Sequence, residues 1–153
     1  MSDEWGTDPD LYHELVRASG IKPEMDYAAS PHYTLVSNGF NKNHNALSRQ
    51  WLKNGFLNPP NSRLRDFITW ATAQWKRNKI DLIILCPAHV IASAYFKPLW
   101  KTLDNYDMIG KSIYPIYKRP RFRSLDGRST DVWASRNPYI AVFLYGNTFE
   151  HDV

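Results

Sequence analysis

The chain has 153 residues, which suits a single domain over residues 1–153 and is long enough to enclose a hydrophobic core. Its apolar and charged fractions, 43% and 22%, are ordinary for a globular protein, and its single cysteine, Cys86, excludes an internal disulfide. No apolar run approaches the roughly 20 residues of a membrane span, and the acidic N-terminus is unlike a secretory signal. We therefore expect a cytoplasmic protein without a membrane partner.

Charge is unevenly distributed along the chain. The net charge of +4 combines −5 over residues 1–30 with +9 over residues 31–153. A basic body favours a polyanionic partner such as nucleic acid, although a solvated surface is the plainer explanation. Five cations of one weakly periodic stretch are the candidate DNA contacts: Lys118, Arg119, Arg121, Arg123 and Arg128.

The first predicted helix begins near Asp8. Asp8 can cap it, Pro9 suits its first position, and Gly20 is a good stop. The apolar stripe between them has helical spacing and consists of Leu11, Leu15 and Val16.

Less regular sequence follows this helix. Residues 25–29 indicate a short extended segment, and residues 30–54 are polar, so we expect loops there with one short helix over residues 46–51. Residues 55–57 predict a short strand.

A second helix is predicted after this strand, with Asn61 or Ser62 as its cap. Its apolar residues recur at i, i+3, i+4, i+7 and i+11, which is typical of a helix with one buried face. They are Leu64, Phe67, Ile68, Ala71 and Trp75.

The continuous apolar run over residues 82–86, ended by Pro87, predicts a strand buried on both faces, as in a parallel sheet. A further helix is expected over residues 91–101, kinked or shortened by Pro98. The remaining predicted elements are weak strands near 108–109 and 112–117, a long loop over 118–138 and an apolar strand over 139–145.

Strands alternating with helices are typical of an open α/β sheet. Ligands of such sheets bind beyond the carboxyl ends of the strands. Asp26, Asn58 and Pro87 fall at three predicted strand ends. We therefore expect these residues to line one crevice.

The end of the strand over residues 55–57 has a chemistry of its own. Pro59 and Pro60 each fix their backbone and lack an N–H, so the Pro59 carbonyl is held in place. Asn58 adds a side-chain carbonyl beside it. Two fixed acceptors could bind both protons of an exocyclic amine and aim its lone pair, whereas a proline-stiffened turn is the plainer explanation.

Several segments stand in a fixed order along the chain. They are Glu4-Trp5-Gly6-Thr7 before a helix with Leu11-Tyr12, residues 25–31, Ala46-Leu47 with Trp51, Asn58-Pro59-Pro60, and Leu85-Cys86-Pro87-Ala88 before an apolar closing strand. In this ordered set the sequence resembles the phage-type DNA N-6-adenine methyltransferases, the small Dam-like family, over roughly residues 4–146.

The resemblance implies S-adenosylmethionine as methyl donor, a Rossmann-like class I methyltransferase sheet flanked by helices, DNA adenine as acceptor, and a viral source acting in the host cytoplasm. It assigns Asn58, Pro59, Pro60 and Asn61 to the catalytic tetrapeptide, whose first residue and following carbonyl grip the amine of a base flipped out of the helix. The positions that match the family's cofactor-binding segments are Trp5, Thr7, Asp26, Ala28, Ala29, Ser30 and Asn45.

Two positions depart from the family pattern. Asn61 stands where the family has an aromatic that stacks on the flipped base, an interaction worth roughly 1–3 kcal/mol. Its loss predicts a rate about ten- to a hundredfold lower, unless another ring such as Trp51 or Phe56 substitutes. Asn45 stands where the family carries an acid that accepts a hydrogen bond from the cofactor's adenine amine. The amide oxygen of Asn45 can still accept this hydrogen bond, but it carries no negative charge.

Other chemistries find little support. The five histidines show no metal-ligand spacing with cysteine or acids, so no metal site is expected, and Cys86 suits a core position better than a nucleophile. Two further functions stay open beside DNA adenine N6-methylation. One is a catalytically weakened protein of the same fold that binds DNA or a host protein. The other is methyl transfer to another exocyclic amine, in cytosine or in RNA.

Overall fold

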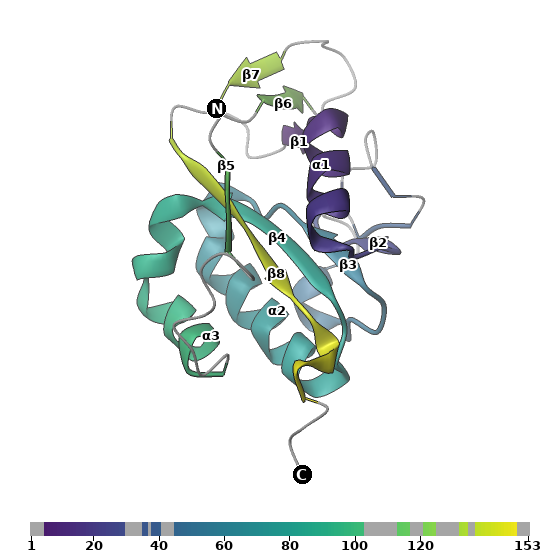
Figure 1. Ribbon diagram of the computed structural model, residues 1–153, viewed down its shortest axis with the longest axis vertical. Helices are drawn as coiled ribbons and strands as arrows, with labels where there is room; N and C mark the ends of the chain where they lie inside the picture. Colours follow the sequence, from purple (N-terminus) through teal and green to yellow (C-terminus); the bar gives the residue numbers. More distant parts are fainter. Residues whose placement is uncertain are drawn as a thin grey trace.

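The computed structural model describes residues 5–29, 35–36, 38–40, 45–102, 113–116, 121–124, 132–134 and 137–149. These residues form a five-stranded mixed sheet with helices on both faces, and a small three-stranded sheet at one end of it (Figure 1). The α/β class predicted from the sequence is confirmed. The Rossmann-like assignment within that class remains a prediction.

The large sheet is only partly parallel. Strands β2, β3 and β4 run parallel, β8 pairs antiparallel with β4, and β5 pairs antiparallel with β8. The spatial order is β2 (Met25–Asp26), β3 (Gly55–Leu57), β4 (Leu82–Pro87), β8 (Tyr139–Leu144) and β5 (Ile113–Ile116). All residues of β4 and β8 are buried, as their continuous apolar sequences predict.

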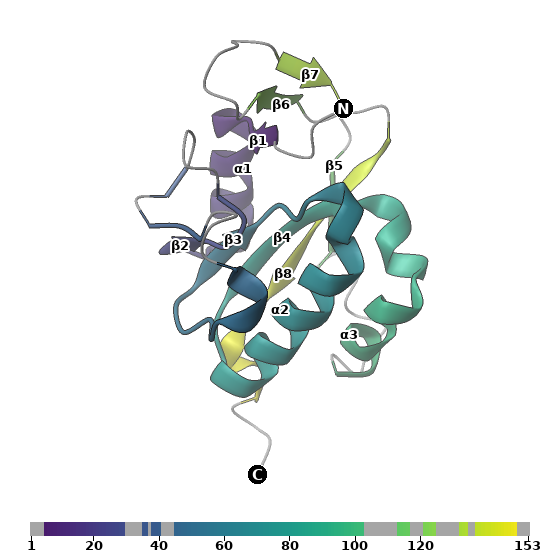
Figure 2. The same cartoon turned by 180° about the vertical axis from the view of Figure 1, so that it is seen from behind.

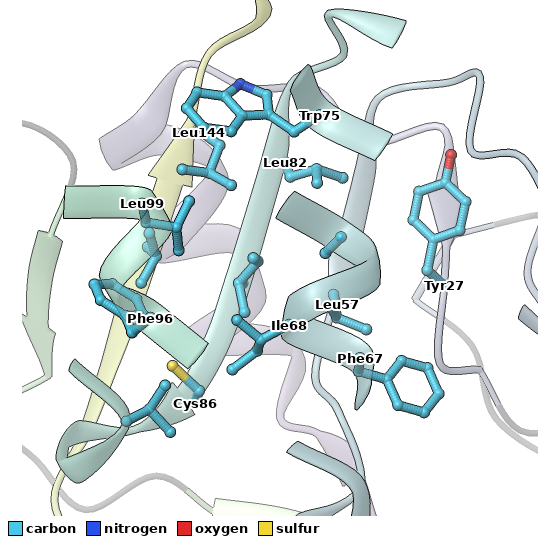
Figure 3. Packing of buried hydrophobic residues seen from close by; sticks show 14 of the residues in the cluster. Tyr27, Leu57, Phe67, Ile68, Trp75, Leu82, Cys86, Phe96, Leu99 and Leu144 are labelled. Atoms are coloured by element: carbon cyan, nitrogen blue, oxygen red, sulfur yellow. The ribbon is translucent and has the colours of Figure 1, made fainter. Parts of the chain in front are cut away.

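The sheet is covered on both faces, because alternate residues of β4 belong to two different hydrophobic cores. Leu82, Ile84 and Cys86 belong to the core shared with α2 (Leu64–Asn78) and α3 (Lys97–Thr102). Ile83 and Leu85 belong to a second core with Tyr12 and Leu15 of α1 (Pro9–Ser19). Figure 3 shows part of the first core, and Figure 2 shows α2 and α3 over the face opposite to α1.

Helix α1 begins and ends where the sequence predicts. Pro9 is its first residue, and Asp8 precedes it in extended conformation, although the Asp8 side chain does not cap the helix. Gly20 ends it in the left-handed region, with φ 72°, where its N–H donates to the Val16 carbonyl at 2.9 Å. Glycine adopts this conformation without strain.

Helix α2 carries the predicted buried face but not the predicted cap. Phe67, Ile68, Ala71 and Trp75 are buried, and Leu64 is half-buried. The N-cap position of α2 is Arg63 and not one of the two candidates, because a 3₁₀ turn, η2 (Asn61–Arg63), stands between the prolines and the helix.

Two other predicted helices are shorter or tighter than expected. The helix expected over residues 46–51 is the 3₁₀ turn η1 (Ala46–Ser48). The helix expected over 91–101 is divided into η3 (Ala88–Ala92), η4 (Ala94–Phe96) and α3, because Ser93 is extended. Pro98 lies in the first turn of α3, where no N–H is needed. The weak strand near 108–109 lies outside the described residues.

The small sheet corrects the expectation of a long loop over residues 118–138. Its strands β1 (Trp5–Thr7), β6 (Arg121–Ser124) and β7 (Val132–Ala134) are antiparallel, in the order β1-β6-β7. It lies beyond the end of the large sheet at which β3 and β4 end (Figures 1 and 2). The last described element is the 3₁₀ turn η6 (Gly146–Phe149). No helix among the described residues is long and apolar enough to cross a membrane.

Candidate active site

Asn58 directly follows β3 and is half-buried. Its Nδ2 donates a hydrogen bond to Oγ1 of Thr7, at 3.1 Å, which links the large sheet to β1 of the small sheet. Within the part of the chain that the structure describes, no hydrogen bond reaches Oδ1 of Asn58. The amide therefore has one N–H donor engaged and its oxygen without a hydrogen-bond partner among the described residues.

The prolines that follow supply the second acceptor. The first bond of the turn runs from the Arg63 N–H to the Pro60 carbonyl, at 3.0 Å, and the Pro59 carbonyl is not part of it. Pro59 is buried and Pro60 half-buried, so the segment is held by packing as well as by its ring constraints. Asn58 and Pro59 thus follow β3 directly, and their pairing as two acceptors for one amine stays a prediction.

Asn61 is exposed, and its side chain hydrogen-bonds the hydroxyl of Tyr139. Burial raises the pKa of Tyr139, and the hydrogen bond with Asn61 acts in the opposite direction. Tyr139 is the first residue of β8 and the register partner of Pro87. Asn61 therefore links the segment after β3 to β8, a contact that no local sequence pattern indicates.

Asp26 ends β2, next to β3 in the sheet, and its side chain is buried, at 8% exposure. Its Oδ1 accepts a hydrogen bond from the Ala28 N–H at 3.1 Å. Burial raises the pKa of Asp26 to about 7, and the bond from Ala28 opposes that rise. A carboxyl with a perturbed pKa at a strand end is a candidate for ligand binding.

Backbone hydrogen bonds to residues 38–40 hold Asp26 and the segment that follows it. Asp26 N–H donates to the Asn38 carbonyl, and the Phe40 N–H donates to the Asp26 carbonyl, at 2.9 and 2.8 Å. Ala29 N–H in turn donates to the Phe40 carbonyl at 2.9 Å, so Ala28 and Ala29 lie in a fixed, half-buried turn.

The remaining predicted cofactor residues differ in how far the structure supports them. Trp5 lies in β1 opposite Ser124, two residues from Thr7. Ser30 lies outside the described residues. Asn45 is exposed, with φ 48°, and its carbonyl accepts from Ser48 at the start of η1. No hydrogen bond among the described residues joins Asn45 to Asp26 or Asn58.

Three of the predicted site residues share one edge of the large sheet. Asp26 ends β2, Asn58 follows β3, and Pro87 ends β4, and these three strands are parallel neighbours. This shared edge agrees with the sequence prediction. The crevice expected between the three residues stays a prediction.

The two rings considered as substitutes for the missing aromatic lie in the core, which corrects that expectation. Trp51 is fully buried and stacks on Tyr27, with ring centroids 4.1 Å apart and planes at 7°. Phe56 is buried and meets the edge of Tyr12, with centroids 5.2 Å apart. Neither ring is accessible to a flipped base.

Two of the five cations proposed from the sequence as DNA contacts lie in the described part of the chain. Arg121 and Arg123 lie in β6, which pairs with β1, whereas Lys118, Arg119 and Arg128 lie outside the described residues. Two further arginines were not among the candidates found from the sequence. Arg63 and Arg65 are exposed and follow Asn58-Pro59-Pro60-Asn61 closely in the chain, and Arg63 also lies 3.5 Å from the carboxylate of Asp66.

Two other chemistries gain no support from the geometry. Cys86 is buried, and burial raises the pKa of its thiol to about 12, so the thiol is unreactive at neutral pH. Among the described residues, no three histidine, cysteine or acidic side chains gather as metal ligands would.

Comparison with known families identifies the family of the chain. The model of one family, DNA N-6-adenine-methyltransferase (Dam), matches residues 1–140, which confirms the resemblance found from the sequence motifs. Comparisons with curated proteins and with solved structures give no match. Since the matched residues make up most of the chain, this chain belongs to the Dam family of DNA N-6-adenine-methyltransferases, whose general activity is methylation of adenine N6 in DNA.

Proposed function

We propose that this chain transfers a methyl group from S-adenosylmethionine to N6 of adenine in DNA, with Asn58 and the Pro59 carbonyl gripping the amine. The observation that carries the proposal is the state of the Asn58 amide. Its NH₂ donates to Thr7, its oxygen has no hydrogen-bond partner among the described residues, and Asn58 follows β3 at the sheet edge where β2 ends with Asp26.

The residues at this edge fit S-adenosylmethionine, which carries a sulfonium and an ammonium group. A buried carboxyl whose ionised form is destabilised by desolvation gains most from a nearby cation, and Asp26 is such a group. We propose that Asp26, Ala28, Ala29 and Ser30 hold the cofactor, with Trp5 and Asn45 at its borders. Bound there, the cofactor supplies a methyl group already activated on positively charged sulfur.

The chain's own contribution is positioning. An exocyclic amine has two hydrogens, and two fixed carbonyl acceptors can take one each. The amine is thereby oriented with its lone pair away from the protein acceptors. The prolines fix these acceptors before binding, so little freedom remains to be lost when the amine arrives. An adenine inside duplex DNA must first leave the base stack to reach this edge.

We propose that DNA lies across the end of the molecule that carries this edge. The basic residues on one side are Arg63 and Arg65, which are exposed in the structure. The other proposed contacts are Lys118, Arg119, Arg121, Arg123 and Arg128. Such cations would bind phosphates and so position the duplex without reading its sequence.

The direct test measures methyl transfer from labelled S-adenosylmethionine to unmodified duplex and single-stranded DNA, together with calorimetry of cofactor binding. We expect cofactor binding and label in the DNA. The absence of both methyl transfer and cofactor binding would contradict the proposal. Tight DNA binding without cofactor binding would instead identify the chain as a non-catalytic DNA-binding member of the family, as Asn61 and Asn45 leave open.

A further inference from the structure

We propose that Thr7 is a positioning residue for Asn58: its hydroxyl holds the amide so that the oxygen, and not the NH₂, faces the amine to be methylated. This inference rests on the proposed function. It gives Thr7 a role different from the cofactor contact that the resemblance implies for its position.

The contact itself is well placed for this role. Thr7 is buried, at 3% exposure, and its Oγ1 accepts from Nδ2 of Asn58 at 3.1 Å. The two residues are 51 positions apart in sequence; Thr7 ends β1 of the small sheet, and Asn58 directly follows β3 of the large sheet. Thr7 is also held by its strand, because β1 pairs with β6 and Thr7 stands opposite Phe122 in that ladder.

The chemistry explains why such a residue is needed. The two ends of an asparagine amide have nearly the same shape, but only the oxygen can accept a hydrogen bond from an amine. With the NH₂ turned toward the amine, two donors would face each other. The following prolines have no N–H that could fix the amide from within the segment. A threonine hydroxyl can donate as well as accept, but in the structure Oγ1 of Thr7 accepts from the Asn58 NH₂, and this arrangement leaves the amide oxygen as the end available to the amine.

A consequence follows for the small sheet. Through Thr7, β1 helps to orient the amide of Asn58, which receives the amine to be methylated. β1 is also a strand of the small sheet, which contains Arg121 and Arg123. The small sheet is thus linked to Asn58 by a hydrogen bond as well as by its place beyond the strand ends.

The test compares Thr7→Val, which removes the hydroxyl at nearly constant shape, with Thr7→Ser, which keeps it. The matched control is Thr72→Val, because Thr72 is also a buried threonine whose hydroxyl donates one bond, to the Ile68 carbonyl at 2.7 Å, but it lies within α2. We expect kcat for DNA methylation to fall roughly ten- to a hundredfold in Thr7→Val. Thr7→Ser and Thr72→Val should stay within about threefold of wild type, and KM for S-adenosylmethionine should be unchanged in all three.

A second measurement does not depend on turnover. In ¹⁵N-labelled protein, the side-chain NH₂ signal of Asn58, assigned by its loss in Asn58→Asp, should shift in Thr7→Val and stay near its wild-type position in Thr72→Val. An unchanged signal would overturn the inference, because the hydrogen bond would then not hold the amide.

The kinetic outcomes separate this inference from the function on which it rests. An active wild type with an equally active Thr7→Val overturns the positioning role alone. A higher KM for S-adenosylmethionine with unchanged kcat overturns it as well, in favour of a cofactor contact. A wild type that transfers no methyl group to DNA overturns the proposed function and removes the basis of the inference with it.

Discussion

The two edges of the large sheet carry similar polar residues but use them differently. At the carboxyl edge, Asn58 keeps an acceptor without a partner among the described residues, and Asp26 is a buried carboxyl beside it. At the amino edge, Asn54 and Asp81 occupy comparable places, one before β3 and one before β4.

At the amino edge the side-chain acceptors are engaged by the backbone. Oδ1 of Asn54 accepts from the Asp81 N–H at 2.9 Å, and Oδ1 of Asp81 accepts from the Gly146 N–H at 2.7 Å. The Asn54 carbonyl accepts in addition from the N–H groups of Glu24 and Met25. This edge ties the strand starts together and leaves little for a ligand.

This difference shows that the residue type alone does not identify a ligand-binding site. An asparagine and an aspartate occur at both edges, in both cases next to parallel strands. What distinguishes the carboxyl edge is an unengaged acceptor, a desolvated acid and a proline-fixed turn at one place. The predictions below test whether this difference is functional.

The largest effect is expected from Asn58→Ala compared with Asn54→Ala. Loss of Asn58 removes one of the two acceptors, so kcat for methylation should fall at least about a hundredfold. Its stability should fall by about 0.5–1.5 kcal/mol, because the hydrogen bond to the Thr7 hydroxyl is lost. Loss of Asn54 leaves the Asp81 N–H without its partner and should cost about 1–3 kcal/mol of stability with kcat unchanged. Rates and unfolding curves of both variants measure this, and equal loss of activity would erase the functional distinction between the edges.

Asp26→Asn should separate stability from function. Asp26 has a pKa of about 7 in the folded chain against an ordinary 3.8, so the folded state binds the proton more tightly. The stability that this provides is present below about pH 3.8 and is lost as the pH rises to about 7. Asparagine avoids the buried charge and keeps an oxygen for the Ala28 N–H.

The variant should therefore be more stable than wild type at pH 8, by a free energy of unfolding on the order of 4 kcal/mol, and should differ little from it at pH 4. Its affinity for S-adenosylmethionine should fall on the order of a hundredfold, because a charge partner of the cofactor is removed. Calorimetry at both pH values measures both effects. A variant that is less stable at pH 8 would show that the Asp26 carboxylate is well paired within the chain.

Asn61→Tyr tests the missing aromatic. Trp51 and Phe56 are buried in the core, so neither replaces it, and a ring at position 61 starts from an exposed position. Stacking worth roughly 1–3 kcal/mol predicts methylation about ten- to a hundredfold faster than wild type. Asn61→Leu serves as control, since it also removes the bond to Tyr139 without adding a ring. Equal rates in the two variants would show that stacking at this position is not limiting.

The smallest effect concerns charge at the two ends of α2. Arg63 and Arg65 stand at the catalytic end, and Lys76 and Arg77 stand in the last turn. Replacing the first pair by alanine should weaken DNA binding several-fold and reduce the slope of log affinity against log salt by about 0.9 for each phosphate that the protein no longer neutralises. Replacing the second pair by alanine changes the charge by the same amount and should leave the DNA affinity and its salt dependence nearly unchanged. Fluorescence anisotropy over a salt series measures the affinities, and equal slopes would place DNA elsewhere.

The sequence predicted best what short-range chemistry dictates. Pro9 and Gly20 bound α1 as expected, and the apolar run before Pro87 is a buried strand. Local capping preference failed at Asn61, because the two prolines before it and its bond to Tyr139 favour a 3₁₀ turn.

What the sequence could not reveal depends on distant pairing. Arg121 and Arg123 belong to a strand because β6 pairs with β1 more than a hundred residues away, and local sequence patterns register only their charge. The hydrogen bond from Asn58 to Thr7 is likewise non-local, and it is this bond that fixes the orientation of the amide. The candidate catalytic residue could thus be found in the sequence, but its partner could not.

The central claim is that the carboxyl edge aims an adenine amine through Asn58. Nucleoside mass spectrometry after incubation of unmodified DNA with S-adenosylmethionine and the protein tests it most directly. The account predicts N6-methyldeoxyadenosine from wild type and from Asn54→Ala, and almost none from Asn58→Ala. The absence of N6-methyldeoxyadenosine from wild type, or its undiminished formation by Asn58→Ala, would contradict it.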